Sequence, residues 1–196
     1  LADMQDSEII PVDSEHNAIY QCLPRERNLN EISKILITAS GGPFREKSLS
    51  DLKGVSIEDA LKHPTWSMGA KITIDSATLV NKCLELIEAH YLFNIPESQI
   101  EIIVHPQSII HSMITFIDGS TIAQMSNPSM EVPISNALGM GTRLPINFKE
   151  IDFSKLNLSF EPVAHDREMI FDMAREVCNK KGNLGVIFNA ANEIAV

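Results

Sequence analysis

The chain has 196 residues, of which 44% are apolar, and its formal net charge is −10. This composition can bury one good core and a partial second unit. Lysine and arginine are scattered singly, which argues against a broad nucleic-acid surface but permits local anion pockets. No apolar run approaches the roughly 18 residues that cross a membrane. We therefore expect neither nucleic acid nor a membrane as a partner.

The first half of the chain predicts short strands alternating with helices and turns. The pattern predicts, in chain order, a short strand at 8–12, the start of a helix at 19–23, a buried strand at 34–39, a turn at 40–43, a loop with one helical piece at 48–69, a strand at 71–75 and a long helix at 78–94.

The second half predicts a hairpin followed by helices. Strands at 100–105, 109–117 and 120–125 are indicated, with Asp118-Gly119 as a hairpin turn. A short helix at 130–138 is interrupted by Pro133, and residues 140–164 have weak periodicity. A second amphipathic helix runs from 166 to 181 and ends at Gly182, and a third follows.

These elements predict an α/β (α+β) fold with a central mixed sheet, helices on one face, a linker and the start of an α-helical domain. Both ends interrupt a pattern, so we expect a fragment of a longer protein. The three cysteines are far apart and form no C-x-x-C pair, which favours a reducing compartment.

Asp13 and Glu15 flank Ser14 at the predicted junction of a strand and a helix. Two carboxylates there are costly to bury without a positive partner, which can be a metal ion, a basic side chain or solvent. Glu85, on the long predicted helix, could supply a third carboxylate. Three such oxygen donors suit Mg²⁺ or Mn²⁺ rather than zinc.

A phosphate site is predicted beside these carboxylates. Asp75 and Ser76 fall where the N-cap of the long helix is expected, and Asn81 and Lys82 follow. A helix N-terminus with an ammonium nearby offers free N–H groups and a positive dipole end to an anion.

Each feature also has an ordinary structural interpretation. Asp13 and Glu15 can be a charge cluster at a helix start, and Glu85 with Lys82 can be a surface ion pair. Residues 40–42 can be a plain turn. Singly, none of these motifs decides the function.

Five segments act together as a signature: PVDSEHNAI (11–19), ILITASGGPFR (35–45), HPTWSMGAKITIDSATLVNKCLELIEA (63–89), VHPQSIIHSM (104–113) and NAANEIAV (189–196). In this order the set closely resembles the 1-deoxy-D-xylulose 5-phosphate reductoisomerase family, over most of the chain. Cys83 departs from the glycine of many relatives, and residues 139–145 replace a Trp-Pro run. The family's glycine-rich NADPH fingerprint is absent from these residues.

The resemblance implies a role for each matching residue. The metal ligands would be Asp13, Glu15 and Glu85, and the catalytic residues Glu15, Glu85 and His63. The substrate would be bound by Ser14, Ser40, His63, Trp66, Ser76, Asn81 and Lys82, with His63 and Trp66 on a mobile loop that closes over it. Ser108 and His111 match positions at the wall of the site, and the cofactor would be contacted by Met68 and Met130.

The resemblance implies NADPH-dependent conversion of 1-deoxy-D-xylulose 5-phosphate to 2-C-methyl-D-erythritol 4-phosphate in non-mevalonate isoprenoid biosynthesis, with Mg²⁺ or Mn²⁺, by a homodimeric enzyme that fosmidomycin targets. The implied domains are the end of an NADPH-binding domain (1–12), a central catalytic and dimerisation domain (13–139), a connecting arm (140–165) and a truncated C-terminal helical domain (166–196). The isolated chain is expected to be inactive.

The implied location is the bacterial cytoplasm, or a plastid if the source has one. Two rival functions stay open. One is a metal-dependent sugar-phosphate lyase or phosphatase, which NADPH consumption would distinguish. The other is a non-catalytic dimerisation module, which failure to bind a divalent ion would favour.

Overall fold

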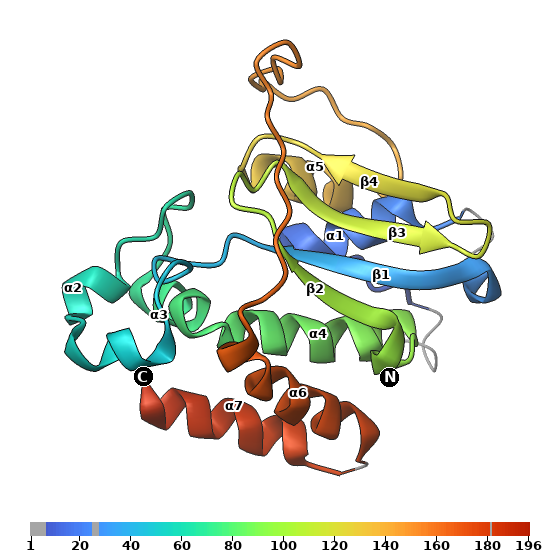
Figure 1. The fold of residues 1–196 in the computed structure, drawn as a ribbon. Helices are drawn as coiled ribbons and strands as arrows, with labels where there is room; N and C mark the ends of the chain where they lie inside the picture. Colours follow the sequence, from blue (N-terminus) through green and yellow to red (C-terminus); the bar gives the residue numbers. More distant parts are fainter. Residues whose placement is uncertain (1–6, 25–27, 181) are drawn as a thin grey trace.

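A four-stranded mixed β-sheet forms the centre of the structure, a computed structural model that describes residues 7–24, 28–180 and 182–196. The strands, in the spatial order β2-β1-β3-β4, are β1 (Ile32–Ala39), β2 (Ile100–Val104), β3 (Ile110–Phe116) and β4 (Thr121–Met125). β1 is parallel to β2 and antiparallel to β3, and β3 is antiparallel to β4 (Figure 1). The predicted mixed sheet and the hairpin after β3 are therefore confirmed.

The apolar core lies between this sheet and the helices α1 (Ser14–Cys22) and α4 (Val80–Phe93). Ile35 pairs with Ile100 on one side and with Ile114 on the other, so three isoleucines form a continuous row. All three are 0% exposed, as are Ile19 of α1 and Leu86 of α4. Burying each such side chain stabilises the fold by roughly 1.5–3 kcal/mol, which fixes α1 and α4 against the sheet.

The other elements surround this centre. They are α2 (Ile57–Ala60), α3 (Ala70–Thr78), α5 (Glu131–Leu138), α6 (Met169–Asn179), α7 (Leu184–Ala195) and the 3-10 helices Leu29–Glu31, Leu49–Gly54, Glu97–Gln99 and His165–Arg167. α6 packs on α4, and α7 packs on α6 and α4 (Figure 1). We call the 3-10 turn His165–Arg167, α6 and α7 the helical unit.

Residues 140–164 connect α5 to the helical unit as a long segment that crosses the sheet in Figure 1. It pairs with the end of β2 through an isolated antiparallel bridge between Glu161 and Val104. Residue 181, the predicted end of a helix, lies outside the described residues. None of the helices within the described residues has the length and apolar character needed to span a bilayer.

Three local predictions are wrong. Residues 8–12 form no strand, and residues 71–75 are helical, as part of α3. The second error arises because Ile72 and Ile74 alternate with polar residues, which imitates the period of a strand, whereas the residues that α3 buries are Thr73, Asp75 and Ala77. Pro133 does not interrupt α5, because it lies in the first turn, where a missing N–H costs nothing.

Candidate active site

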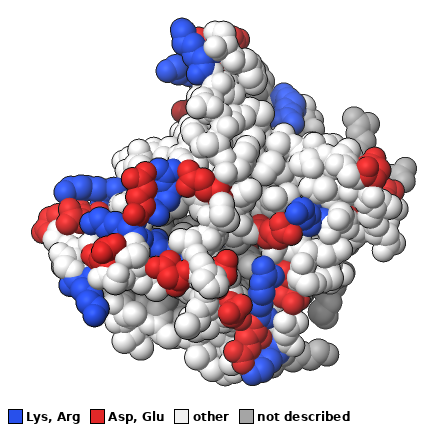
Figure 2. Space-filling model, viewed as in Figure 1, with Lys and Arg blue, Asp and Glu red and all other residues white. Residues whose placement is uncertain are grey.

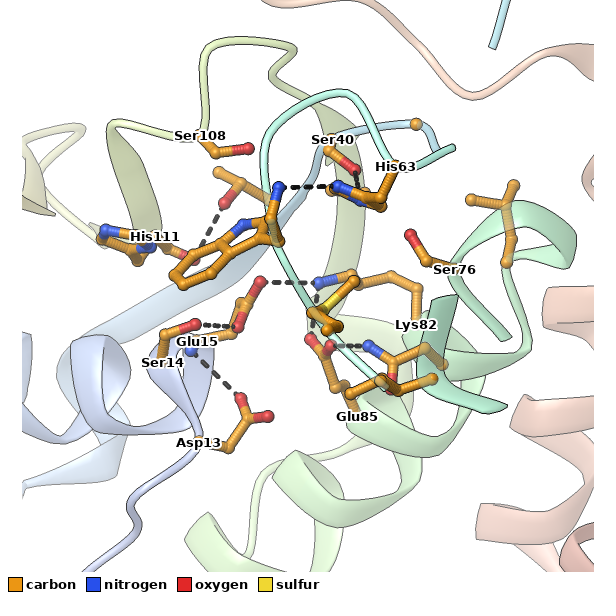
Figure 3. Close-up of a pocket in the computed structure, with 18 of the residues that line it drawn as sticks. Asp13, Ser14, Glu15, Ser40, His63, Ser76, Lys82, Glu85, Ser108 and His111 are labelled. Carbon is orange, nitrogen blue, oxygen red and sulfur yellow. Dashed lines mark hydrogen bonds and ion pairs between the residues drawn. The ribbon is translucent and has the colours of Figure 1, made fainter. Parts of the chain in front are cut away.

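A cavity of about 310 Å³ opens at the carboxyl end of β1, between the starts of α1 and α4 and the end of α3. Figure 3 shows side chains from these separate elements pointing into it. Every site residue named in the sequence analysis lines this cavity: Asp13, Ser14, Glu15, Ser40, His63, Trp66, Met68, Ser76, Asn81, Lys82, Glu85, Ser108, His111 and Met130. The fold thus brings the whole predicted set together.

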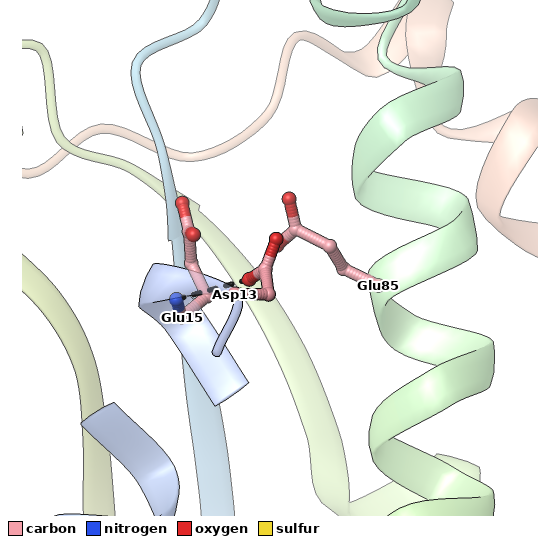
Figure 4. Close-up of side chains that lie close together, drawn as sticks. All are labelled: Asp13, Glu15 and Glu85. Atoms are coloured by element: carbon pink, nitrogen blue, oxygen red, sulfur yellow. Dashed lines mark hydrogen bonds between the residues drawn. The ribbon is translucent and has the colours of Figure 1, made fainter. Parts of the chain in front are cut away.

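Three carboxylates meet on one side of the cavity. Oxygens of Asp13, Glu15 and Glu85 lie within 4.8 Å of one another, as Figure 4 shows. Asp13 is the N-cap of α1 and accepts a hydrogen bond of 3.1 Å from the backbone N–H of Glu15, whereas Glu85 approaches from α4. Three oxygen donors at this spacing fit a Mg²⁺ or Mn²⁺ ion.

The ammonium of Lys82 lies among these carboxylates. Its Nζ is 3.0 Å from Glu15 Oε1 and 2.6 Å from Glu85 Oε2, and the residue is only 5% exposed. Burial opposes the charge, but the carboxylates of Glu15 and Glu85 outweigh it and raise the pKa of Lys82 above its ordinary value. Lys82 therefore balances the carboxylate cluster, a contact that its predicted role in phosphate binding does not include.

The environment of Glu85 disfavours its ionised form. Burial raises its pKa well above the ordinary value, the charge of Glu15 raises it further, and Lys82 opposes the rise. Asn81 donates a 2.5 Å hydrogen bond to Glu85 Oε1. One ammonium among three carboxylates leaves an excess of negative charge, which a divalent cation would relieve.

His16 contacts two members of the cluster from outside the cavity lining, and no role was predicted for it from the sequence. Its Nδ1 is 3.0 Å from Asp13 Oδ1, and its Nε2 is 2.9 Å from the backbone oxygen of Glu85. Both partners are acceptors, so both ring nitrogens donate. Burial alone would lower the pKa of His16, but the hydrogen bond and charge of Asp13 raise it to about 9. The spacing of His16 from Asp13, one helical turn, is the signal that could have identified it.

Ser40 and His63 form the opposite side of the cavity. His63 Nδ1 accepts hydrogen bonds from the backbone N–H groups of Thr65 and Trp66, at 3.1 and 2.8 Å, so its proton is on Nε2. That Nε2–H donates to Ser40 Oγ at 3.0 Å, and the N–H of Gly42 donates to the same oxygen at 3.2 Å. Burial lowers the pKa of His63, in keeping with the neutral ring. The hydroxyl hydrogen of Ser40 is left to donate into the cavity.

Ser76 reaches the cavity from the last turn of α3, and its predicted place at the N-cap of the following helix is wrong. α3 and α4 are separate helices joined at Leu79, whose φ of +66° is left-handed. Gly42 packs directly on α3: a Cβ at Gly42 would lie 2.7 Å from the backbone oxygen of Ser76. Only glycine permits this approach, which places the loop of Ser40 against the helix that carries Ser76.

The remaining residues complete the wall of the cavity. The rings of Trp66 and His111 meet edge to face at 6.1 Å between centroids. Burial lowers the pKa of His111, which is 3% exposed. Ser108 adopts a left-handed conformation with φ of +50°, and Met130 is 39% exposed beside the cavity.

An α/β unit that gathers three carboxylates, a lysine and two serines around one cavity could hold a divalent metal ion and, beside it, a phosphate group. Comparison with known proteins gives the particular family. A sequence model described as the 1-deoxy-D-xylulose 5-phosphate reductoisomerase C-terminal domain matches residues 9–93, and one described as the DXP reductoisomerase C-terminal domain matches residues 125–196. The chain belongs to the 1-deoxy-D-xylulose 5-phosphate reductoisomerase family.

Individual relatives agree with this assignment. The chain is 50% identical to the 1-deoxy-D-xylulose 5-phosphate reductoisomerase of Chlamydia caviae over an alignment of 197 positions, which covers 100% of the chain and 52% of the relative. It is 52% identical to that of a Geobacillus species over 190 residues, which are 96% of the chain and 50% of the relative. The chain thus spans about half the length of the curated relatives it matches.

Solved structures give the same result. A crystal structure of DOX-P reductoisomerase in complex with NADPH, fosmidomycin and magnesium is 41% identical, with a TM-score of 0.92 over 99% of this chain and 50% of that one. The enzyme from Zymomonas mobilis in complex with NADPH is 45% identical, with a TM-score of 0.91 over 99% of this chain and 50% of that one.

Proposed function

We propose that the chain forms the metal- and substrate-binding part of an enzyme that converts 1-deoxy-D-xylulose 5-phosphate to 2-C-methyl-D-erythritol 4-phosphate with NADPH, in non-mevalonate isoprenoid biosynthesis. The observation that carries this proposal is the cluster of Asp13, Glu15 and Glu85 beside a cavity lined by Ser40 and Ser76. Membership of the family and the ligands named for the solved relatives support it.

In this proposal Asp13, Glu15 and Glu85 hold Mg²⁺ or Mn²⁺. The bound ion would stabilise the negative charge that develops on substrate oxygens as the carbon skeleton rearranges. His16 keeps the Asp13 carboxylate oriented through their 3.0 Å contact. Ser14, whose hydroxyl donates to Glu15 Oε2 at 2.6 Å, lies where it can also reach the backbone of the substrate.

The opposite side of the cavity binds the phosphate. The Ser40 hydroxyl is oriented by two donors and presents its own hydrogen to an anion. Ser76, Asn81 and Lys82 line the same cavity. Binding energy from this remote group orients the reacting carbons. The loop that carries His63 and Trp66 would cover the substrate and exclude water.

NADPH supplies the hydride for the reduction, and its main binding domain would lie outside these residues. Met68 and Met130, both on the cavity wall, are the proposed contacts to its nicotinamide. The proposed layout is residues 1–12 as the end of that NADPH-binding domain, 13–139 as the catalytic and dimerisation domain, 140–165 as a connecting arm and 166–196 as the start of a helical domain.

The proposed assembly is a homodimer built on the sheet. β4 is an edge strand of the sheet. Ile117, in the turn before β4, is 71% exposed, and Ile122, on β4 itself, is 49% exposed. An unpaired strand edge with exposed apolar side chains favours association with another chain. Light scattering coupled to gel filtration would give the mass of a dimer, and a monomer at high concentration would contradict this assembly.

Calorimetry with fosmidomycin, which carries a phosphonate and a hydroxamate, tests the proposed site on the chain itself. We expect fosmidomycin to bind the Mn²⁺-loaded chain and to bind the metal-free chain much more weakly, because the hydroxamate needs the ion. Inorganic phosphate should compete with it. Equal binding with and without Mn²⁺, or no binding at all, would contradict the proposed function.

A further inference from the structure

The helical unit contacts the loop that carries Ser40 and the helix α3 that carries Ser76, although none of its own residues lines the cavity. One contact is made by Arg167, which is 8% exposed. Its Nη2 donates to the backbone oxygens of Phe44, at 2.6 Å, and Lys47, at 2.8 Å. Asp166 adds a third link, because its carboxylate accepts a 2.8 Å hydrogen bond from the N–H of Leu49.

These bonds fix the far end of the loop that contains Ser40. The near end is held by β1, which ends at Ala39, and by the 2.7 Å hydrogen bond from His105 N–H to the Ala39 carbonyl. Between the two ends, Gly41 and Gly42 have φ of +84° and +66°, conformations that the chain adopts readily only at glycine. A segment with two consecutive glycines can adopt many backbone conformations, so its geometry depends on how its two ends are held.

The second contact is made by Asn192 of α7. Its Nδ2 donates to Asp75 Oδ1 at 2.9 Å, and the two residues are 9% and 3% exposed. Lys71 extends the same link, because its ammonium contacts Asp75 Oδ2 at 2.6 Å and Glu193 at 3.1 Å. Asp75 immediately precedes Ser76, so α7 holds α3 at the turn that directs Ser76 into the cavity.

We propose that Arg167 and Asn192 are positioning residues that set the separation of Ser40 and Ser76, and thereby the affinity of the cavity for the phosphate group of its ligand. The inference rests on the proposed function of that cavity and assigns to the helical unit a part in substrate binding. Arg167 acts through the loop of Ser40, and Asn192 acts through α3. The metal carboxylates lie on α1 and α4 and are not tethered by either residue.

The chain offers a matched control for Arg167. Arg175, on α6 of the same unit, also donates from its guanidinium to two backbone oxygens, those of Glu97 and Ile100. Those oxygens belong to the opposite end of the sheet from Ser40, at the start of β2. Arg167→Met and Arg175→Met therefore remove the same kind of tether, but only the first lies beside the phosphate side of the cavity.

The experiment measures three dissociation constants for the full chain by calorimetry: for Mn²⁺ alone, for fosmidomycin with Mn²⁺ present, and for acetohydroxamate with Mn²⁺ present. Acetohydroxamate carries the metal-binding group but no phosphonate. We expect Arg167→Met to weaken fosmidomycin binding about tenfold, with the Mn²⁺ and acetohydroxamate constants unchanged. Arg175→Met should leave all three constants unchanged.

Asn192→Ala tests the second contact independently, and Asn189→Ala, at an exposed position of the same helix, is its control. We expect Asn192→Ala to weaken fosmidomycin binding without changing the Mn²⁺ and acetohydroxamate constants, and Asn189→Ala to change none of the three. Arg167→Lys, whose ammonium can still donate to a loop carbonyl, should recover part of the affinity lost in Arg167→Met. Thermal melting establishes that each variant is folded.

Unchanged fosmidomycin affinity in folded Arg167→Met and Asn192→Ala would overturn the inference. Equal losses in Arg167→Met and Arg175→Met would also overturn it, because general docking of the helical unit would then explain the effect. Failure of the unmodified chain to bind fosmidomycin would be a different result, since it would overturn the proposed function and this inference with it.

Discussion

Replacement of Lys82 by methionine is the most informative perturbation of the carboxylate cluster. Methionine keeps much of the length of the side chain and removes the ammonium. In the unmodified chain that ammonium lies 3.0 Å from Glu15 and 2.6 Å from Glu85, almost out of contact with water. Lys82→Met therefore leaves Glu15 and Glu85 facing each other without their ammonium in the metal-free chain, with the imidazolium of His16 still beside Asp13.

The size of the effect follows from that burial. Removing one partner of a buried ion pair costs about 3 kcal/mol of unfolding free energy, and for a chain of this length that lowers the Tm by roughly 6–12 °C. Mn²⁺ takes over as the counter-charge. At a free concentration of 100 times its Kd, bound Mn²⁺ raises the unfolding free energy by about 2.7 kcal/mol, which offsets most of the destabilisation. Mn²⁺ should also bind more tightly to the variant, because no ammonium competes for the carboxylates.

Differential scanning fluorimetry with and without Mn²⁺, combined with calorimetry, measures both effects. Lys62→Met is the control, because Lys62 forms an ion pair with Asp59 at 3.0 Å but its side chain is 72% exposed. Its removal should change the unfolding free energy by less than about 0.5 kcal/mol. A metal-free Lys82→Met chain as stable as the unmodified one, or a variant with weaker Mn²⁺ binding, would refute the reasoning.

Three further predictions concern the surroundings of the cluster. His16→Ala should weaken Mn²⁺ binding about tenfold, because Asp13 loses the group that orients it; an unchanged Mn²⁺ titration would count against this role. His16 has a pKa of about 9 in the folded chain against an ordinary 6.5, so the metal-free folded chain binds more protons between these values. The contribution of His16 to the free energy of unfolding should be fully present below pH 6.5 and should be lost as the pH rises toward 9, a slope that His16→Ala removes in denaturant titrations. Gly42→Ala should cost roughly 1–3 kcal/mol and weaken fosmidomycin binding, since its Cβ would meet the Ser76 carbonyl at 2.7 Å. Gly119→Ala, which has a similar φ of +85° in open space, should leave fosmidomycin binding intact.

The gathering of the site could be predicted because its residues occur in short motifs at the ends of periodic segments. Asp13 and Glu15 lie at the start of one helix, and Ser40 follows the strand that the sheet buries at its centre. The resemblance of five ordered segments to a known family then assigns the whole set of site residues. Residue type and local period alone predicted the mixed sheet, the hairpin and the candidate metal and phosphate groups.

Contacts between distant segments could not be predicted. Lys82 meets Glu15 across 67 residues and His16 meets the Glu85 carbonyl across 69, so both depend on how α1 packs beside α4. Arg167 reaches the Phe44 carbonyl across 123 residues. The error over residues 71–75 also reflects packing, because the alternation of Ile72 and Ile74 with polar residues imitates a strand, whereas the folded chain buries Thr73, Asp75 and Ala77 of a helix.

The proposed function depends most directly on Asp13, Glu15 and Glu85 sharing one divalent ion. Titration of Mn²⁺ into the chain, followed by the electron paramagnetic resonance signal of free Mn²⁺, measures this without any substrate. We predict a single saturable site in the unmodified chain and in Glu58→Gln, which alters an exposed carboxylate on α2, and loss of that site in Glu85→Gln. Equal Mn²⁺ affinity in Glu85→Gln and the unmodified chain would contradict the account.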